Sequence, residues 1–338
     1  MRILILGGTI FVGRHLVADA LKKNHDVTLF HRGKHNPGLF GGAVETITGD
    51  RAVADDLAKL ANGREWDAVI DTCGYVPRIV RMSADVLKDS TRTYCFISTV
   101  SVYADWSVND VNEDSALATL TDPATEEVTG ETYGGLKALC ERAVRDVCGD
   151  SRTLIVRPGY IVGPHDPSDR FTYWPHRVAR GGDILAPGDE NTAAQFVDVR
   201  DLAEWNLRLL EGGVTGTFNA DGLPVRFAEL LPACRTAAGL TEAAARFVYV
   251  PEPFLSEQGV ESWQMLPIFT PKAAEDAGCV DVSRAVASGL TFRPLAETVA
   301  DTLAWDKTRT EDANTYKNTL TADREYSLLA AFRNTENR

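Results

Sequence analysis

Tyr133 and Lys137 lie four residues apart in the segment YGGLK. Residues at positions i and i+4 of a helix share one face, so a helix here would present a phenol and an ammonium group to the same cleft. A free phenol has a pKa of about 10, and a nearby positive charge stabilises its ionised form. The pair is therefore suited to moving a proton to or from a substrate hydroxyl, with Tyr133 as the acid/base.

A cluster of hydroxyl side chains supports this catalytic interpretation. The apolar run Tyr94–Ile97 predicts a strand, and Ser98, Thr99 and Ser101 follow it directly. Open α/β sheets place their active sites at such strand ends. We expect Thr99 to hydrogen-bond the substrate oxygen. Taken alone, the Tyr-x-x-x-Lys spacing equally describes an aromatic residue packed on a helix beside a solvated lysine.

A glycine loop stands near the start of the chain. The segment GGTIFVG at 7–13 separates the apolar run Ile3–Leu6 from the amphipathic stretch Val12–Leu21. Glycines at such a turn let backbone N–H groups approach a pyrophosphate at a helix N-terminus. The residues expected to contact a dinucleotide here are Gly7, Thr9, Ile10, Phe11, Val12 and Gly13. A plain strand-to-helix turn is the alternative.

The residues after the second apolar run, Val27–Phe30, bear on which dinucleotide binds. An NAD-preferring site generally has an acidic residue there, but this chain has His31, Arg32 and Lys34. A guanidinium can pair with a 2′-phosphate. We therefore expect NADP(H) as the cofactor, with NAD(H) as the second choice. The alternative is an exposed basic turn that binds no ligand.

Two later turns add candidate cofactor contacts. Asp50 and Arg51 follow the expected strand Thr46–Thr48, where a carboxylate can meet the adenine amino group or cap the next helix. Cys73 and Gly74 close the strand expected at Ala68–Ile70, where small residues let the chain pass close to the cofactor.

The elements that must position these residues alternate between short apolar runs and amphipathic stretches. This order predicts an α/β fold: a doubly wound parallel sheet of the Rossmann type with a smaller, interleaved C-terminal substrate-binding lobe. We expect a dinucleotide-binding domain at 1–163 with contributions from about 190–220, the lobe at 164–310, and a C-terminal helix and tail at 311–338. The helix, Ala322–Phe332, is expected at the surface.

Composition narrows the class of protein. The 338 residues carry a formal net charge of −13, which disfavours general binding to nucleic acid or to anionic membranes. Six scattered cysteines show no metal-ligand or disulfide spacing, and His165 and His176 lack suitably spaced acidic or cysteine partners, so no metal is expected. No run of apolar residues is long enough to span a bilayer. We expect a cytoplasmic protein, either a monomer or a homodimer.

Five motifs occur in the order found in the extended short-chain dehydrogenase/reductases, which include sugar-nucleotide epimerases, dehydratases and dihydroflavonol-type reductases. They are GGTIFVG at 7–13, STVSVY at 98–103, YGGLK at 133–137, RPGYIVGP at 157–164 and QFVDVRDLA at 195–203. The chain resembles this family over roughly residues 1–305.

The resemblance implies a nicotinamide cofactor and catalytic roles for Thr99, Tyr133 and Lys137, with Lys137 also holding the nicotinamide ribose. It further implies that the nicotinamide is bordered by Pro158, Gly159, Tyr160 and Ile161. Two departures stand out: Ile10 replaces a glycine, and Thr99 stands where many members have serine. Arginine at position 32 matches the dihydroflavonol-type reductases.

The substrate is less well defined. Sugar-nucleotide epimerases carry a diphosphate-binding arginine directly before the segment that corresponds to Gln195–Val199, and here that place is Ala194. Arg170, Arg177 or Arg226 would have to replace it, so we favour a smaller carbonyl or alcohol. Candidate substrate contacts are Tyr75, Ser101, His165, Arg170, Trp174 and Trp263, although each aromatic residue among them suits ordinary packing equally well.

Three functions remain open at this stage. The favoured one is reversible hydride transfer between nicotinamide and a small carbonyl or alcohol. An epimerase or dehydratase with a retained NAD(P) is the second. A cofactor-binding regulator or an RNA-associated protein on the same fold is the third, because fold alone does not determine function.

Overall fold

The computed structural model describes residues 1–107, 111–260, 262, 265–269, 279–309, 316 and 319–336. Its centre is a seven-stranded parallel sheet with the order β11-β6-β5-β4-β1-β2-β3. The strands are β1 (Arg2–Leu6), β2 (Asp26–His31), β3 (Glu45–Thr48), β4 (Trp66–Asp71), β5 (Thr91–Ile97), β6 (Thr153–Pro158) and β11 (Gly216–Ala220). The strand order reverses on either side of β1, which confirms the doubly wound α/β fold expected from the sequence and places a ligand crevice at the carboxyl ends of the strands.

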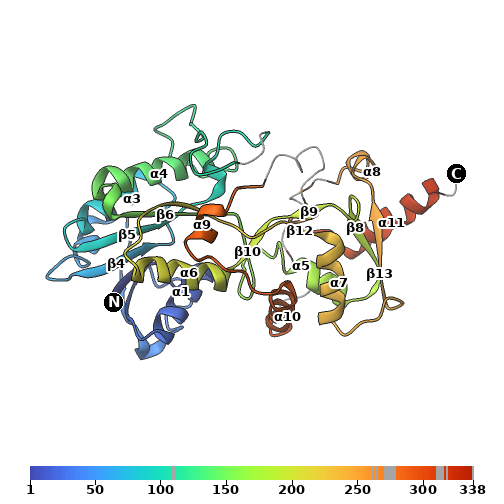
Figure 1. The fold of residues 1–338 in the computed structure, drawn as a ribbon, viewed down its shortest axis with the longest axis horizontal. Coiled ribbons are helices and arrows are strands. Elements are labelled where there is room, and N and C mark those ends of the chain that lie inside the picture. The colour runs from blue at the N-terminus through green and yellow to red at the C-terminus, as the bar shows by residue number, and fades with distance from the viewer. Residues whose placement is uncertain are drawn as a thin grey trace.

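Helices cover both faces of this sheet (Figure 1). One face carries α1 (Phe11–Lys22) and α6 (Val199–Glu211), and the other carries α3 (Pro77–Leu87) and α4 (Tyr133–Cys148), with α2 (Ala54–Ala58) beside α3. The apolar run of β1 has no polar alternation because both faces are buried. Ile3 and Ile5 pack in the cluster with α1 and α6, whereas Leu4 and Leu6 pack in the cluster with α3 and α4.

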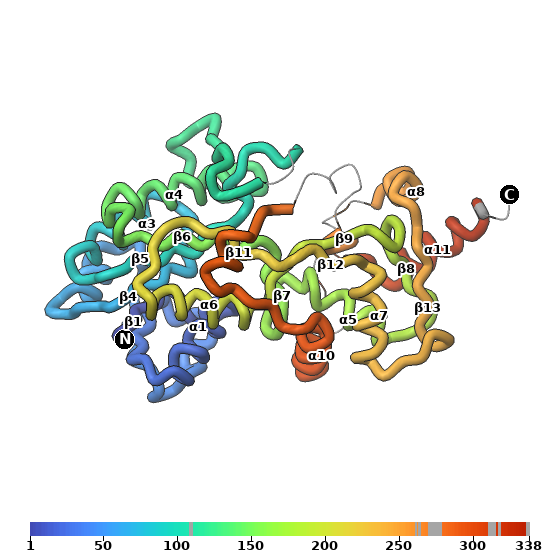
Figure 2. Tube along the Cα trace, in the orientation of Figure 1, coloured from blue at the N-terminus to red at the C-terminus, as the bar shows by residue number. Residues whose placement is uncertain are grey.

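A second body of structure adjoins the carboxyl ends of the strands (Figures 1 and 2). Its helices are α5 (Tyr173–Ala179), α7 (Phe227–Ala237), α8 (Glu252–Glu257), α10 (Leu295–Asp306) and α11 (Ala322–Glu336). Its paired strands are β7 (Tyr160–Val162) with β10 (Phe196–Asp198), β8 (Gly182–Pro187) with β13 (Ala245–Val250), and β9 (Ala193–Ala194) with β12 (Val225–Arg226). Between these elements the chain returns to the sheet through α6 and β11, and α9 (Ser283–Ala287) packs against β11.

Short 3-10 helices occupy three turns: η1 (Gly41–Ala43), η2 (Val100–Val102) and η3 (Asp150–Arg152). All six cysteines carry free thiols, of which only Cys279 is exposed. Within the described ranges, no helix combines the length and the apolar character needed to cross a bilayer.

The C-terminal helix α11 is more deeply integrated than the surface helix expected from the sequence. Leu328 and Leu329 are buried in the core of the lobe. Glu325 forms a buried ion pair with Arg177 and accepts a hydrogen bond from the backbone N–H of Leu185 at 3.0 Å. The expectation was wrong because the partners of the polar Glu325 lie about 140 residues earlier in the chain.

Candidate active site

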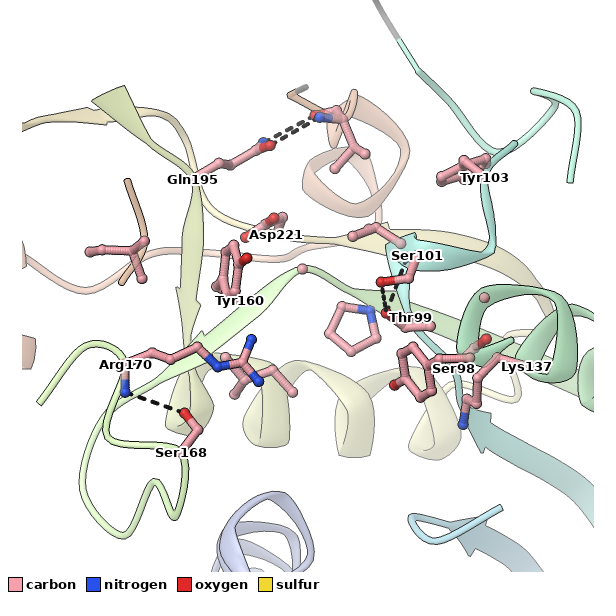
Figure 3. A pocket seen from close by; sticks show the side chains of 18 of the residues that line it. Ser98, Thr99, Ser101, Tyr103, Lys137, Tyr160, Ser168, Arg170, Gln195 and Asp221 are labelled. Atoms are coloured by element: carbon pink, nitrogen blue, oxygen red, sulfur yellow. Dashed lines mark hydrogen bonds between the residues drawn. The ribbon is translucent and has the colours of Figure 1, made fainter. Parts of the chain in front are cut away.

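A cavity of about 1050 Å³ lies where the carboxyl ends of β5 and β6 face the lobe. Figure 3 labels Thr99, Ser101, Lys137, Tyr160 and Arg170 in this cavity. In all, the cavity gathers twelve of the residues singled out from the sequence: Phe11, Val12, Tyr75, Thr99, Ser101, Tyr133, Lys137, Pro158, Gly159, Tyr160, Ile161 and Arg170. They come from six separate stretches of chain that the sheet brings to one edge. The three expected catalytic residues are among them.

Lys137 forms the floor of this cavity. Helix α4 begins at Tyr133, so Lys137 lies one turn further along on the same face. Its Nζ donates hydrogen bonds to the carbonyl oxygens of Gly74 and Ile97, both at 2.8 Å, and lies 4.1 Å from the centre of the Phe96 ring. Burial lowers the pKa of Lys137 to about 8, so the ammonium stays charged near neutral pH and is held in one place.

The two glycines between Tyr133 and Lys137 allow the helix to approach the hydroxyl cluster closely. A β-carbon at Gly134 would lie 2.1 Å from the Ser101 carbonyl oxygen, and one at Gly135 would lie 2.5 Å from the Leu120 side chain. Larger residues would push the start of α4 away from η2. The glycines therefore set the distance between Tyr133 and the Thr99 turn.

Tyr133 and Thr99 meet at the centre of the cavity. Burial raises the pKa of Tyr133, while a hydrogen bond with the Thr99 side chain and the positive charge of Arg170 lower it. The Thr99 Oγ1 also accepts from the Ser101 backbone N–H at 3.1 Å, which fixes the turn. The Tyr75 ring lies 6.5 Å from the Tyr133 ring, centre to centre, and forms the outer wall.

A buried network supports this centre from behind. Ser98 donates to Glu141 at 2.5 Å, and Glu141 forms a two-pronged ion pair with Arg157, at 3.0 and 2.7 Å. Arg157 also donates to the Tyr103 hydroxyl, which donates to Asn219 at 2.6 Å. Every polar group in this chain of contacts has a partner, so α4, β5, β6 and β11 are held in a single arrangement.

The glycine loop has the geometry needed for a dinucleotide. Gly7 has a φ of 106°, and a β-carbon there would lie 2.5 Å from the Thr72 hydroxyl. One at Gly13 would lie 2.8 Å from the Gly8 backbone, so the turn and the first turn of α1 are in direct contact. Ile10, at the start of α1, provides no side-chain cap, which leaves the first N–H groups of the helix open to an anion. The residues present fit a bound pyrophosphate.

The basic turn after β2 packs against this loop. Asn36 donates to the Thr9 carbonyl oxygen at 3.3 Å, and the Gly7 N–H donates to the Phe30 carbonyl oxygen at 2.9 Å. Arg32 and Lys34 are exposed on the turn and form no ion pair with any residue that the structure describes. Both are therefore free to meet a ligand that lies along the loop.

Asp50 and Arg51 behave differently from expectation. Asp50 accepts from the backbone N–H of Ala52 at 2.9 Å and so closes its own turn. It does not cap the next helix, because α2 begins at Ala54 without a side-chain cap, so that alternative was wrong. Arg51 is not directed to the groove: its guanidinium forms a two-pronged ion pair with Asp71 at 2.7 and 2.6 Å and also donates to Ser83. Arg51 thus links the turn after β3 to the end of β4. The prediction that Arg51 contacts the cofactor directly is replaced by this structural role.

Cys73 and Gly74 lie beside the loop at the end of β4. The Cys73 thiol donates to the Leu6 carbonyl oxygen at 3.4 Å, and burial raises the pKa of that thiol. The carbonyl oxygen of Gly74 is one of the two acceptors of Lys137. The turn therefore links the glycine loop to the cavity floor.

Two of the expected substrate contacts lie outside the cavity. Trp174 is fully buried and donates from its indole to the Pro267 carbonyl oxygen at 2.9 Å, so it is a core residue of the lobe. His165 packs against Trp305 with ring centres 5.2 Å apart and does not line the cavity. Trp263 lies outside the described residues. Ordinary packing, the alternative considered from the sequence, accounts for Trp174 and His165.

The structure also adds a residue that sequence reasoning missed. Asp221 lines the cavity, is 4% exposed and has its pKa raised to about 8 by burial. A signal for it was present, because it follows the strand β11 directly and precedes Gly222, as a site residue at the carboxyl end of a parallel strand does.

Comparison with known proteins agrees with this geometry. The model of the NAD dependent epimerase/dehydratase family matches residues 3–220. A chloroplast stem-loop binding protein of 41 kDa b from Arabidopsis thaliana is 29% identical over 258 residues, 71% of this chain, but the match spans only 64% of that relative. UDP-glucose 4-epimerase from Neisseria meningitidis is 24% identical over 291 residues, covering 71% of this chain and 83% of the relative.

Among solved structures, the Bordetella bronchiseptica enzyme WbmH, in complex with NAD+, superposes with a TM-score of 0.68. The superposition covers 92% of this chain and 99% of that one, at 18% sequence identity. At this identity the likeness establishes the shared fold.

Proposed function

The chain belongs to the NAD-dependent epimerase/dehydratase family, and on that premise we propose that it catalyses NADP(H)-dependent hydride transfer between nicotinamide and a small carbonyl or alcohol. The observation that carries the proposal is the Thr99–Tyr133–Lys137 arrangement: a phenol paired with a hydroxyl, above an ammonium group held by two carbonyl oxygens. A binding protein without chemistry has no need of this set.

Each side chain has a separate task. The nicotinamide, when bound, supplies or accepts the hydride. Tyr133 takes the proton of the substrate hydroxyl in oxidation and returns it in reduction, and Thr99 orients the same oxygen. Lys137 is proposed to stabilise the Tyr133 phenolate through its positive charge, in addition to Arg170, whose charge lowers the pKa of Tyr133. The Tyr75 ring and residues of the lobe form walls of the cavity around the reacting groups.

The preference for NADP(H) rests on the turn after β2. Arg32 and Lys34 are exposed cations beside the glycine loop, and no acidic residue occupies the end of β2 itself. A 2′-phosphate would gain two charge-assisted contacts there, whereas NAD(H) would gain neither.

An epimerase or dehydratase with a retained NAD(P) is the second candidate. The family match and the 24% identical UDP-glucose 4-epimerase favour it. The two chemistries share the Tyr133 step and differ in cofactor exchange. Cofactor that survives purification and shows no net change in redox state during turnover identifies the second candidate. Free exchange with net reduction identifies the first.

We further propose that the partner is a small molecule and not a nucleic acid, despite the name of the Arabidopsis relative. The net charge of −13 opposes phosphate backbones, and the cavity has the dimensions of a small-molecule site. A salt-sensitive mobility shift with stem-loop RNA would contradict this part of the proposal.

The test of the catalytic proposal compares Tyr133→Phe with Tyr75→Phe. Both remove one hydroxyl from the cavity, but only Tyr133 pairs with Thr99. In a screen of alcohols and carbonyls with NADP(H), Tyr133→Phe is expected to lower kcat by about 10²-fold or more while cofactor affinity is retained. Tyr75→Phe is expected to keep most of the activity. Full activity of Tyr133→Phe contradicts the proposal.

A further inference from the structure

Arg170 is a cation of the cavity wall that forms no ion pair with any described residue, although its charge lowers the pKa of nearby Asp166. Its guanidinium lies 5.3 Å over the centre of the Tyr160 ring and forms no ion pair within the described part of the chain. Acidic residues outnumber basic ones by 48 to 35 in this protein, so most arginines have a carboxylate available. An arginine stacked on an aromatic ring at a cavity wall is prepared for an anion from solution.

The loop that carries Arg170 is held in place. Asp166 accepts from the backbone N–H of Ser168 at 2.8 Å and from its hydroxyl at 2.9 Å. Asp169 pairs with Arg309 at 2.6 Å and is almost fully buried. The guanidinium is therefore positioned before any ligand arrives, which reduces the entropy lost on binding.

The position of Arg170 relative to the reaction centre limits the size of the ligand. Its positive charge is close enough to lower the pKa of Tyr133. Figure 3 shows the Arg170 side chain reaching across the cavity toward the wall that carries Thr99 and Lys137. An anionic group on Arg170 and a reacting carbon beside Tyr133 therefore fit within one small molecule.

Among the residues that the structure describes, no other cation is placed to join Arg170 in binding a diphosphate. Arg177 is committed to Glu325, and Arg226 points outside the cavity beside Glu229. Lys137 is 3% exposed and bonded to two carbonyl oxygens. Among the described lining residues the acidic groups are Glu131, Asp166 and Asp221. One accessible positive charge among these acids suits an anion with a single charge.

The Asp221 carboxyl group is a second feature of the cavity that is suited to contact a ligand. Its Oδ1 accepts from the Gly222 N–H at 2.9 Å, and Oδ2 makes no hydrogen bond with any described residue. Burial raises the pKa of Asp221 to about 8, so near neutral pH it is mainly an uncharged acid with a proton to donate. Figure 3 places it beside Tyr160, the residue whose ring Arg170 covers.

We propose that Arg170 and Asp221 form a subsite for a substrate with a single carboxylate: Arg170 pairs with the carboxylate, and Asp221 hydrogen-bonds an oxygen of the same molecule. The substrate class is then a small hydroxy acid or the corresponding keto acid. This deepens the proposed function and rests on it for the reaction, but the subsite itself is tested by binding alone.

The experiment is calorimetric titration of the full chain, saturated with NADP+, against matched probes. The pairs are D-glucuronate with D-glucose and D-glycerate with glycerol, and UDP-glucose represents the diphosphates. We expect at least one carboxylate to bind about tenfold or more tightly than its neutral partner. Arg170→Gln removes that preference, whereas Arg226→Gln, an exposed cation outside the cavity, keeps it.

Several binding results would contradict the proposed Arg170–Asp221 subsite. Tightest binding by UDP-glucose, equal binding of carboxylate and neutral probes, no binding by any probe, or a preference that survives Arg170→Gln overturns the subsite. Asp221→Asn is expected to keep carboxylate binding, while Asp221→Leu lowers it by about tenfold. Thermal melts of all variants verify folding. Carboxylate binding that persists in a protein unable to bind NADP+ or NAD+ would reject the proposed function and leave the subsite standing.

Discussion

The Oδ2 atom of Asp221 lies 1.7 Å from the position that a β-carbon on residue 159 would occupy. Gly159 follows β6, and Asp221 follows its parallel neighbour β11, with Ala220 paired to Pro158 in the register. The absence of a side chain at Gly159, the first glycine of the RPGYIVGP motif, thus leaves the space that the buried Asp221 carboxyl group occupies. The φ angle of Gly159 is not in the left-handed region, so this space, and not backbone conformation, explains the residue.

Replacement of Gly159 by alanine therefore has a specific expected cost. Gly159→Ala forces Asp221 out of its site, and overpacking of this kind costs about 1–3 kcal/mol in free energy of unfolding. The double variant Gly159→Ala/Asp221→Ala recovers most of that cost because the colliding atoms are gone. Gly38→Ala is the control, since nothing lies within 4 Å of its added carbon. Urea unfolding of the wild type, both single variants and the double variant measures these free energies. If the effects of the two substitutions simply add, the contact between residue 159 and the Asp221 side chain is contradicted.

Asp221→Asn gives a pH-dependent prediction. The folded protein holds a proton on Asp221 up to about pH 8, whereas an unfolded aspartate releases it near pH 4. The wild type therefore loses stability as pH rises from about 4 through 8, relative to a variant that cannot ionise. Within the described residues, Tyr160 and Cys279 are titratable groups that interact with Asp221. Unfolding curves at about pH 5 and pH 9 are expected to show a larger gain for Asp221→Asn at pH 9, and an equal gain would refute the assignment.

The Tyr133 hydroxyl is expected to titrate differently with and without cofactor. Burial raises its pKa in the protein alone. Bound NADP+ adds a positive charge near the phenol and is expected to lower that pKa. NMR of protein with ¹³C-labelled tyrosine follows the titration, with Tyr133→Phe to assign the resonance. A pKa that does not move when NADP+ binds would place the nicotinamide elsewhere.

Arg32→Asp tests the basis of cofactor preference. Loss of the guanidinium and gain of a carboxylate are expected to weaken NADP+ binding by about tenfold or more and to leave NAD+ binding unchanged or improved. Arg92→Asp is the matched control, because Arg92 is an exposed cation near the start of β5, at the amino ends of the strands and so away from the crevice at their carboxyl ends. Equal losses in the two variants would show a general charge effect and no 2′-phosphate contact.

Local signals were sufficient for much of this architecture. Strands β1, β2, β4, β5 and β6 were predictable because each contains an apolar run that is buried on both faces, whereas β3 is mostly exposed. Helix α4 begins at Tyr133, where the spacing to Lys137 required a helix. The glycine loop was equally clear, since its geometry depends on residues within one turn.

Features that depend on distant parts of the chain could not be predicted. Arg51, which follows β3, pairs with Asp71 at the end of β4, and β1 and β2 separate these two strands in the sheet. Trp174 belongs to an aromatic stretch whose composition suits a core and a pocket equally. Its assignment to the core depends on the buried hydrogen bond from its indole N–H to the Pro267 carbonyl oxygen. The significance of Asp221 depends on the missing side chain of Gly159, a contact that no local pattern contains.

The most direct test of the central claim is calorimetric titration of the purified protein with NADP+ and with NAD+, after a check for cofactor retained from the cells. We expect exchangeable, micromolar binding with a preference for NADP+, about 6–8 kcal/mol of binding free energy. We also expect Gly13→Val to abolish this binding, because a side chain there would collide with the Gly8 backbone. Failure of the wild-type protein to bind either dinucleotide would contradict the proposed function.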